Sequence, residues 1–226
     1  MFKQAIANLA EILIRQGVRR AVIAPGSRNA PLTLALTSRS ELTCLSVTDE
    51  RSAAFMANGI AQFSGEPVAV VCTSGTAVLN FAPAVAEAYY QNLPLIVITA
   101  DRPLAWIDQS DGQTIRQQDI FRPYVKASFQ FPESDEKNDT WFADRMASEA
   151  LNTAKSFPAG PVHINIPLNE PLYVTLPDAS PNLKIIDMEE VVAQLSDKTV
   201  AELNHTWQKA GRKMIIAGIH QPDVAF

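Results

Sequence analysis

The run Val68–Cys72 constrains the fold of this chain more than any other feature, because five consecutive apolar residues stand between a turn at Pro67 and a polar segment that begins at Thr73. A strand without a polar face must be covered on both sides, which is typical of the parallel sheets of α/β proteins. Leu95–Thr99 nearly repeats the pattern. Segments between such runs carry apolar residues at helical spacing. The sequence therefore predicts an α/β fold, a three-layer, mainly parallel sheet with helices on both faces.

The order of the expected elements suggests two domains. Strands are expected at residues 19–24, 42–47, 68–72, 95–99, 127–131 and 161–167, and helices at 5–13, from 30 onward, and at 50–63, 76–90, 141–156 and 188–209. The polar, irregular pattern of residues 104–124 predicts a long loop with one short helix. Loops of this length are usually functional or mobile. We expect residues 1–180 to form a first domain. Residues 181–226 would then hold a linker, a helix and the first strand (213–218) of a truncated central domain, so that the chain is the front part of a longer protein.

Charge and hydropathy exclude several classes of partner. A net charge of −5 without a cluster of lysines or arginines argues against nucleic-acid binding. No apolar run reaches the roughly 18 residues of a membrane span, and the chain starts without a signal-peptide pattern, so we expect a cytoplasmic protein with no membrane partner. Cys44 and Cys72 lie in strand-like runs and are expected to be buried free thiols. His163, His205 and His220 lack metal-ligand spacing, so no metal site is expected in these residues.

Polar segments follow four of the expected strands. They are Gly26-Ser27-Arg28, Asp49-Glu50, Ser74-Gly75-Thr76 and Asp101-Arg102. Ligands of open parallel sheets bind beyond the carboxyl ends of the strands, so we expect these segments to lie together. Two arginines and one glutamate there suit a substrate that bears carboxylates.

Each of these segments also has a plainer interpretation. The local pattern by itself favours Glu50 as a surface acid in the first turn of a helix that Asp49 caps. Arg28 and Arg102 are equally compatible with ordinary salt bridges. The Ser-Gly-Thr turn often does no more than start a helix, and it is not a P-loop because it lacks the lysine.

Five ordered motifs carry a resemblance to a known family. They are Ala24–Thr33, Asp49–Phe55, Cys72–Asn80, Ile98–Pro103 and Gln113–Gln117. They resemble the pyrimidine-binding domain of thiamine-diphosphate enzymes and, more narrowly, the 2-succinyl-5-enolpyruvyl-6-hydroxy-3-cyclohexene-1-carboxylate synthases of menaquinone biosynthesis. An acetolactate synthase would be expected to share only the Glu50 helix and the Thr-Ser-Gly turn.

The resemblance implies thiamine diphosphate and Mg²⁺ as cofactors. Glu50 would be the catalytic residue, binding the pyrimidine N1′ of the cofactor and favouring its imino tautomer. This role needs a protonated carboxyl, so we expect apolar walls that raise its pKa, with Phe55 among them. Thr73, Ser74 and Gly75 would also contact the cofactor. The diphosphate and the metal would be held by a C-terminal domain with a Gly-Asp-Gly…Asn motif, which these residues do not contain.

The same resemblance implies a reaction and its substrates. Ser27, Arg28, Arg102 and Gln113 would line the substrate side. The enzyme would decarboxylate 2-oxoglutarate and add the succinyl carbanion equivalent to isochorismate. Gly112 departs from the family pattern, because a polar residue such as Asn is expected before Gln113.

Assembly and two further hypotheses complete these expectations. The full-length enzyme would be a homo-oligomer, a dimer or tetramer, with its active site between subunits, and this fragment alone would be inactive and bind the cofactor weakly. The alternatives are another thiamine-diphosphate decarboxylase or acetolactate-synthase-like enzyme, and a non-catalytic α/β binding module.

Overall fold

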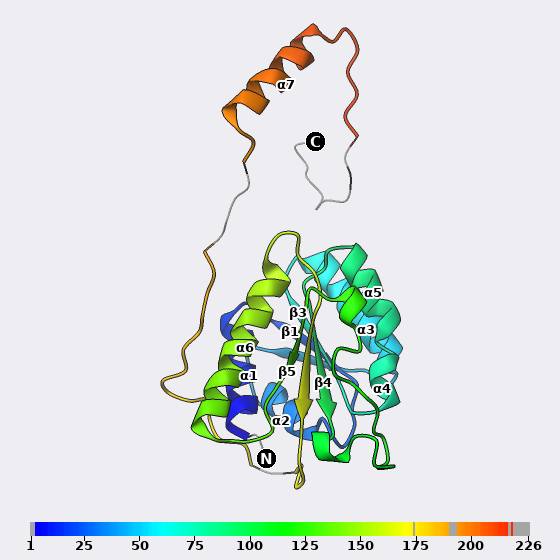
Figure 1. The fold of residues 1–226 in the computed structure, drawn as a ribbon, viewed down its shortest axis with the longest axis vertical. Coiled ribbons are helices and arrows are strands. Elements are labelled where there is room, and N and C mark those ends of the chain that lie inside the picture. The colour runs from blue at the N-terminus through cyan, green and yellow to red at the C-terminus, as the bar shows by residue number, and fades with distance from the viewer. Residues whose placement is uncertain (1–2, 174, 190–193, 217, 219–226) are drawn as a thin grey trace. The chain divides into compact units, whose positions relative to one another are not determined.

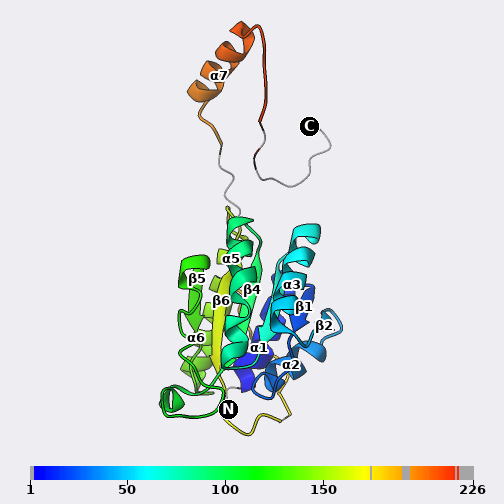
Figure 2. The same ribbon diagram turned by 90° about the vertical axis from the view of Figure 1, so that its right-hand side faces the viewer.

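The computed structural model describes residues 3–173, 175–189, 194–216 and 218. The chain divides into two units, Met1–Asp187 and Met188–Phe226. The first unit is built on a six-stranded sheet of order β2-β1-β3-β4-β6-β5, in which every neighbouring pair is parallel (Figures 1 and 2). The strands are β1 Arg20–Ile23, β2 Thr43–Ser46, β3 Val68–Cys72, β4 Leu95–Asp101, β5 Ala127–Gln130 and β6 Val162–Pro167.

Helices cover both faces of this sheet, as the sequence predicts (Figure 1). The helices of the first unit are α1 Lys3–Arg15, α2 Ala30–Thr37, α3 Glu50–Ser64, α4 Thr76–Leu79, α5 Ala82–Tyr90 and α6 Lys137–Lys155, with short 3₁₀ turns η1 Leu104–Trp106 and η2 Arg122–Tyr124. Alternate side chains of each strand point to opposite faces. Ile23 and Val71 therefore join a core with α1, α2 and α6, whereas Val22 and Val70 join a core with α3, α4 and α5. The α/β fold class is confirmed.

Several boundaries differ from the sequence prediction. The helix expected at 76–90 is two helices, because Pro83 stands in the first turn of α5; proline lacks an N–H and its ring excludes the carbonyl four residues earlier. β4 continues beyond the expected residue 99 to Asp101. Residues 104–124 contain two 3₁₀ turns rather than one short helix.

The second unit contains one helix in its described residues, α7 Asp197–Lys209. It begins nine residues after the expected start because Ser196 caps it, accepting a hydrogen bond from Thr199 N at 3.2 Å. Residues 190–193 of the expected helix lie outside the described residues. Residues 213–216 carry no regular structure, and a strand needs a partner for its hydrogen bonds. Residue 217 of that expected strand lies outside the described residues.

Candidate functional site

The strand order places a topological switch point at the carboxyl edge of the sheet, between β1 and β3. β1 neighbours β2 on one side and β3 on the other, so the connections from β1 to β2 and from β3 to β4 run in opposite directions across the sheet. Ligands of such sheets bind outside the carboxyl ends of the strands at this switch point. The turn after β1 and the turn after β3 flank it. All four polar segments named above follow carboxyl ends of parallel strands, so they lie at this edge.

Two glycines bring three turns into close contact. A Cβ at Gly26 would lie 2.5 Å from Cβ of Thr73, so the turn after β1 sits against the turn after β3. A Cβ at Gly75 would lie 3.0 Å from the backbone of Gln113, and Gly75 adopts a φ of +86°. Such an approach and such a φ are open to glycine alone at little cost. Residues 26, 73–75 and 113 therefore form one closely joined group.

Two buried hydroxyl groups in this group lack a partner. Thr73 and Ser74 are both buried, and neither Thr73 Oγ1 nor Ser74 Oγ has a hydrogen-bond partner among the described residues. Buried polar atoms are nearly always paired, and leaving one unpaired costs about 1–3 kcal/mol. Both hydroxyl groups are therefore free to bind a polar ligand.

Glu50 begins α3 beyond the end of β2. Asp49 is the N-cap, as predicted, and its side chain accepts a hydrogen bond from Ser52 N at 2.8 Å. At 100° per residue, Glu50 shares a helix face with the buried Ala54 and Ala57, so its side chain belongs to the face turned to the sheet. Burial, and secondly the charge of Glu50, raise the pKa of the Cys72 thiol. The carboxylate of Glu50 therefore lies near the end of β3.

Phe55 does not form the expected apolar wall for Glu50. Five residues along a helix correspond to a rotation of about 140°, so Phe55 lies on nearly the opposite face of α3, and it is 44% exposed. Glu50 itself is half-buried in the described residues. Small side chains, among them Ala53 and Ala54, are the apolar residues on its own face.

Arg28 and Arg102 line one pocket of about 370 Å³, together with Trp106, Asp111 and Glu170. The sequence predicted that the two arginines converge, but it did not identify the other three residues. Trp106 is one of the few aromatic residues in the polar loop, which is the signal that could have identified it. The same pocket also includes Pro103 and Asn169.

Each arginine is already paired with one carboxylate. Arg28 donates from Nη1 to Leu168 O at 2.8 Å, and its Nη2 lies 3.4 Å from Glu170 Oε1. Arg102 donates from Nη2 to Gly112 O at 2.8 Å, and its Nε lies 3.1 Å from Asp111 Oδ2. The salt bridges of the plainer interpretation are therefore present. A guanidinium has five donors, however, and exposed carboxylates such as Glu170 are weak partners, so both arginines can bind a further anion.

Ser27 and Gln113 do not line the arginine pocket. Both side chains are exposed, and Gln113 adopts a φ of 55°. Gln113 reaches the group of turns through its backbone, at Gly75. Ser27 accepts a backbone hydrogen bond from Ala30 N at 3.2 Å at the start of α2. The structure thus places Ser27 and Gln113 at the rim of the site, apart from the guanidinium groups.

A buried polar network lies beneath the loop that follows β4. Thr99, His163 and Asn165 point to the face that carries α5, where Gln117 and Phe121 of the loop cover them. Thr99 donates to Asn165 Oδ1 at 2.7 Å, and Asn165 donates to Asp101 Oδ2 at 2.7 Å. This network was not predicted from the sequence. The signal was the alternation of polar His163 and Asn165 with three apolar residues in β6.

Burial sets the charge state of two members of this network. It raises the pKa of Asp101 to about 6, although hydrogen bonds from Asn165 and from the N–H of Arg102 act in the opposite direction. Burial lowers the pKa of His163 to about 3, so its imidazole is neutral at physiological pH. Because Thr99 gives its hydrogen to Asn165, His163 Nε2 is the donor in the 2.8 Å contact with Thr99 Oγ1.

No group of three His, Cys, Asp or Glu side chains in the described part of the chain could hold a metal ion. None of its helices combines the length and the hydropathy of a membrane span. Cys44 and Cys72 are free thiols, as predicted, and Cys72 is buried while Cys44 is half-buried.

Two kinds of comparison with known proteins, one with protein families and one with individual proteins, agree with each other. Residues 4–120 match the family described as thiamine pyrophosphate enzyme, N-terminal TPP binding domain. The 2-succinyl-5-enolpyruvyl-6-hydroxy-3-cyclohexene-1-carboxylate synthase of Bacteroides fragilis is 45% identical over 216 residues, which cover 96% of this chain and 39% of the relative. The synthase of the same name from Desulfotalea psychrophila is 46% identical over 219 residues, 96% of this chain and 41% of the relative.

A third relative shows the same proportions. The synthase of that name from Cytophaga hutchinsonii is 44% identical over 224 residues, which cover 97% of this chain and 40% of the relative. The chain thus spans about two fifths of the length of these curated relatives. The family match at residues 4–120 includes all the turns of the candidate site and residues 113–117 of the loop.

Proposed function

The chain belongs to the family of thiamine pyrophosphate enzymes, as their N-terminal TPP binding domain, and we propose that it is the N-terminal part of a carboligase of menaquinone biosynthesis. The complete enzyme decarboxylates 2-oxoglutarate and adds the succinyl group to isochorismate. The names and identities of the relatives support this proposal. Residues 1–180 form its pyrimidine-binding domain, and residues 181–226 lead into a central domain.

The convergence of Arg28 and Arg102 in one pocket is the observation that carries the substrate proposal. 2-Oxoglutarate is a dicarboxylate and isochorismate also bears carboxylates, and guanidinium groups bind carboxylates through two parallel hydrogen bonds. An incoming carboxylate replaces Glu170 and Asp111, which are the exposed and partly exposed partners of the two arginines. Trp106 offers the flat apolar wall that a cyclic substrate needs. Ser27 and Gln113 contact the substrates from the rim.

The residues at the switch point fit the pyrimidine end of thiamine diphosphate. Thr73 Oγ1 and Ser74 Oγ lack partners in the described residues. Glu50 stands near the end of the same strand β3. When bound, thiamine diphosphate supplies the nucleophilic carbon and the electron sink that decarboxylation of a 2-oxo acid requires.

Glu50 is the residue that would hold the pyrimidine ring of the cofactor. It is half-buried at the start of α3, on the helix face turned to the sheet. Its carboxyl group would hydrogen-bond a ring nitrogen of the pyrimidine and would serve there as a general acid or base. Mg²⁺ and the diphosphate are held by a further domain of the longer protein.

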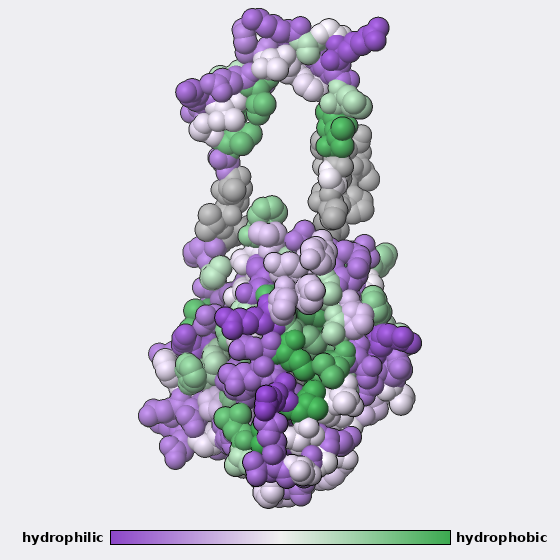
Figure 3. Space-filling model, turned by 45° about the vertical axis from the view of Figure 1, so that its right-hand side comes forward, coloured by the Kyte–Doolittle hydropathy of each residue, from purple (hydrophilic) through white to green (hydrophobic). Residues whose placement is uncertain are grey.

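An exposed apolar surface supports assembly into a homo-oligomer. Apolar side chains gather on the face that carries α3, α4 and α5 (Figure 3). Phe55, Met56, Phe63 and Leu79 are exposed there. Apolar patches of this kind mark interaction sites in soluble proteins. We therefore propose that the full-length enzyme is a dimer or tetramer. We also propose that it acts in the cytoplasm.

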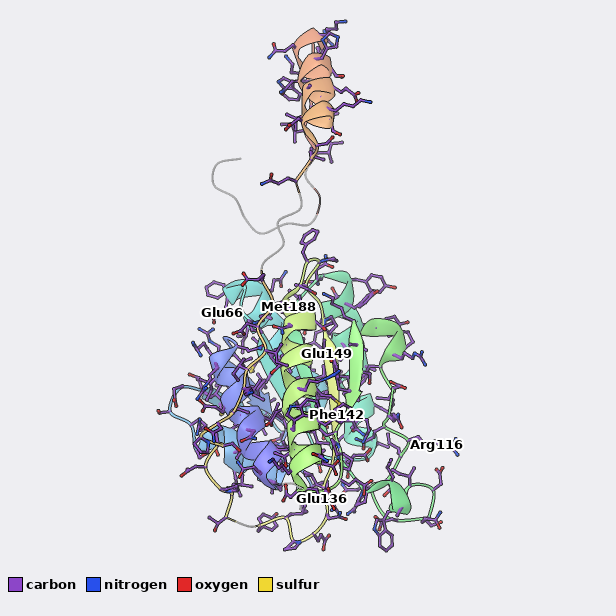
Figure 4. The ribbon with its side chains drawn as sticks, turned by 60° about the vertical axis from the view of Figure 1, so that its left-hand side comes forward. Glu66, Arg116, Glu136, Phe142, Glu149 and Met188 are labelled. Atoms are coloured by element: carbon purple, nitrogen blue, oxygen red, sulfur yellow. The ribbon has the colours of Figure 1, made fainter. Side chains whose placement is uncertain are left out.

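Turnover by the full-length protein tests the proposal. The assay supplies 2-oxoglutarate, isochorismate, thiamine diphosphate and Mg²⁺ to the wild type and to Glu50→Gln, which cannot transfer the proton. We expect the variant to lose at least about 100-fold in kcat, the usual contribution of a positioned acid or base. Glu149→Gln is the matched control, because Glu149 lies on α6, across the sheet from α3, and forms an exposed ion pair with Arg145 (Figure 4).

Three results would contradict the proposal. Unchanged turnover in Glu50→Gln would remove the catalytic role of Glu50. Activity on pyruvate but not on the two proposed substrates would indicate an acetolactate-synthase-like enzyme and leave the arginine assignments unsupported. Absence of turnover with any 2-oxo acid would favour a non-catalytic binding module.

A further inference from the structure

Gln117 is a buried amide that connects the loop after β4 to the turn after β3. Its Oε1 accepts a hydrogen bond from Gly75 N at 2.8 Å. Its Nε2 donates to Ala100 O at 3.0 Å and to Asn165 Oδ1 at 2.9 Å. Only 1% of the residue is exposed. The neighbouring side chains of Arg116 and Gln118 are exposed, and Figure 4 shows Arg116 at the outer edge of the loop. Gln117 is therefore the side chain of this loop segment that is directed inward, and both hydrogens of its amide are donated in hydrogen bonds.

The hydrogen bond to Gly75 sets the direction of a peptide group in residues 73–75, which we call the cofactor turn. The N–H of Gly75 points to Gln117, and in a trans peptide the carbonyl of the preceding residue points the opposite way. Gln117 therefore directs the carbonyl of Ser74 to the other side of the turn. Gly75 has a φ of +86°, and glycine alone lets this peptide rotate at little cost. Without Gln117 the Gly75 N–H would be a buried donor without its partner.

The other two bonds connect the turn to the arginine pocket. Ala100 and Asn165 belong to the ends of β4 and β6, and Asn165 also donates to Asp101, which accepts from the N–H of Arg102 at 2.7 Å. The chain of contacts thus runs from Gly75 through Gln117 and Asn165 to the backbone that carries Arg102. A buried network of hydrogen bonds of this kind restricts its members to one arrangement.

We propose that Gln117 is a positioning residue, whose amide fixes the Ser74–Gly75 peptide and holds the cofactor turn in register with the arginine pocket. This role rests on the proposed function, because it assigns to the turn the contact with thiamine diphosphate. Gln117 itself touches neither cofactor nor substrate. It acts through Gly75 and through Asn165, so its loss changes cofactor affinity more than it changes the fold.

Two variants of Gln117 separate positioning from simple structural support. Gln117→Met keeps the volume but removes all three hydrogen bonds. Gln117→Glu keeps an acceptor for Gly75 N but turns an ionised oxygen toward Ala100 O and Asn165 Oδ1. When that carboxyl is protonated it donates again, so the variant recovers as the pH falls. Gln118→Met and Gln118→Glu are the matched controls, because they make the same changes on an exposed neighbour in the loop.

The first measurement is amide hydrogen exchange of the segment 73–76 in the full-length protein without cofactor. We expect exchange at least tenfold faster in Gln117→Met and unchanged in Gln118→Met. The second is calorimetric titration with thiamine diphosphate and Mg²⁺, in which we expect Kd to rise at least tenfold for Gln117→Met. For Gln117→Glu we expect the loss relative to wild type to be smaller at pH 5.5 than at pH 8. The wild type at each pH corrects for Asp101 and His163, the titratable side chains of the same network.

The outcomes are distinguishable from failure of the proposed function. If the wild type turns over neither proposed substrate, the carboligase assignment fails, yet the exchange measurement still decides whether Gln117 holds Gly75. Unchanged exchange in Gln117→Met would overturn the proposal. Faster exchange with an unchanged Kd would overturn it as well, because Gln117 would then support the fold without positioning the cofactor turn. A Gln117→Glu defect that is equal at both pH values would refute the role of the donated hydrogen bonds.

Discussion

Gly26 provides the closest approach between the two turns of the switch point, and Gly26→Ala tests whether this approach builds the site. The new Cβ would lie 2.5 Å from Cβ, 2.7 Å from Cγ2 and 2.9 Å from Oγ1 of Thr73. Non-bonded carbon atoms rest at about 3.5–4.0 Å, so the two turns must separate by about 1 Å. The φ of Gly26 lies outside the left-handed region, so the effect of alanine comes from the contact alone.

The expected cost follows from this displacement. Forcing an extra methyl group into a packed position typically costs about 1–3 kcal/mol. We expect chemical denaturation to show a loss of this size for Gly26→Ala. Because a shift of about 1 Å in catalytic geometry costs up to about 100-fold in rate, we also expect kcat/KM of the full-length protein to fall by about 10- to 100-fold.

Two companion variants identify the cause. Gly59→Ala makes the same substitution inside α3, where a Cβ meets nothing within 4 Å, and should stabilise by about 0.5–1 kcal/mol. In a Thr73→Gly background all three contacting atoms are absent, so the cost of Gly26→Ala in stability should shrink. A Gly26→Ala protein as stable and as active as wild type would refute the reasoning. So would a cost that is unchanged in the Thr73→Gly background.

Two further predictions concern stability. His163 has a pKa of about 3 in the folded protein, where it is neutral, and of about 6.5 when the chain is unfolded. Because the unfolded state binds the proton more readily, the free energy of unfolding falls as the pH drops below 6.5. At about 1.4 kcal/mol per pH unit, we expect a loss of about 2 kcal/mol between pH 7 and pH 5. His163→Gln can keep the donor to Thr99 but does not titrate, so its stability measured by urea denaturation should lack this slope, and equal slopes would count against the buried neutral imidazole. Asp49→Ala removes the acceptor for Ser52 N and should lower stability at neutral pH. The loss should vanish at a pH low enough to protonate Asp49 in the wild type, because its lowered pKa stabilises the fold only above the unfolded value; a loss independent of pH would show that the cap is not electrostatic.

The sequence alone predicted the sheet, and it predicted that the candidate site residues lie at the carboxyl edge of that sheet. Apolar runs such as Val68–Cys72 predicted strands buried on both faces. The regular alternation of strands with helices predicted that the strands are parallel. Parallel strands end at a common edge, so the polar segments after four of them had to meet. The start of α3 was also readable, because Asp49 caps its own helix within three residues. These features depend on residues close together in the chain.

Other features depended on contacts that no local pattern contains. Gln117 contacts Gly75 and Asn165 across separations of 42 and 48 residues. The pocket joins Arg28 to Glu170 over 142 residues. Phe55 was expected to lie beside Glu50 because only five positions separate them in the sequence. On α3 those five positions correspond to a rotation of about 140°, which directs the two side chains to different faces of the helix.

The division between these two kinds of knowledge has a physical reason. Apolar periodicity, caps and turns reflect the conformation of each segment and which of its faces is buried, and these fixed the α/β fold and gathered the candidate residues at one edge. Which donor meets which acceptor within that edge is decided when the segments pack. A buried hydrogen bond requires two atoms within about 3 Å, and only the tertiary structure brings Gln117, Gly75 and Asn165 to that distance.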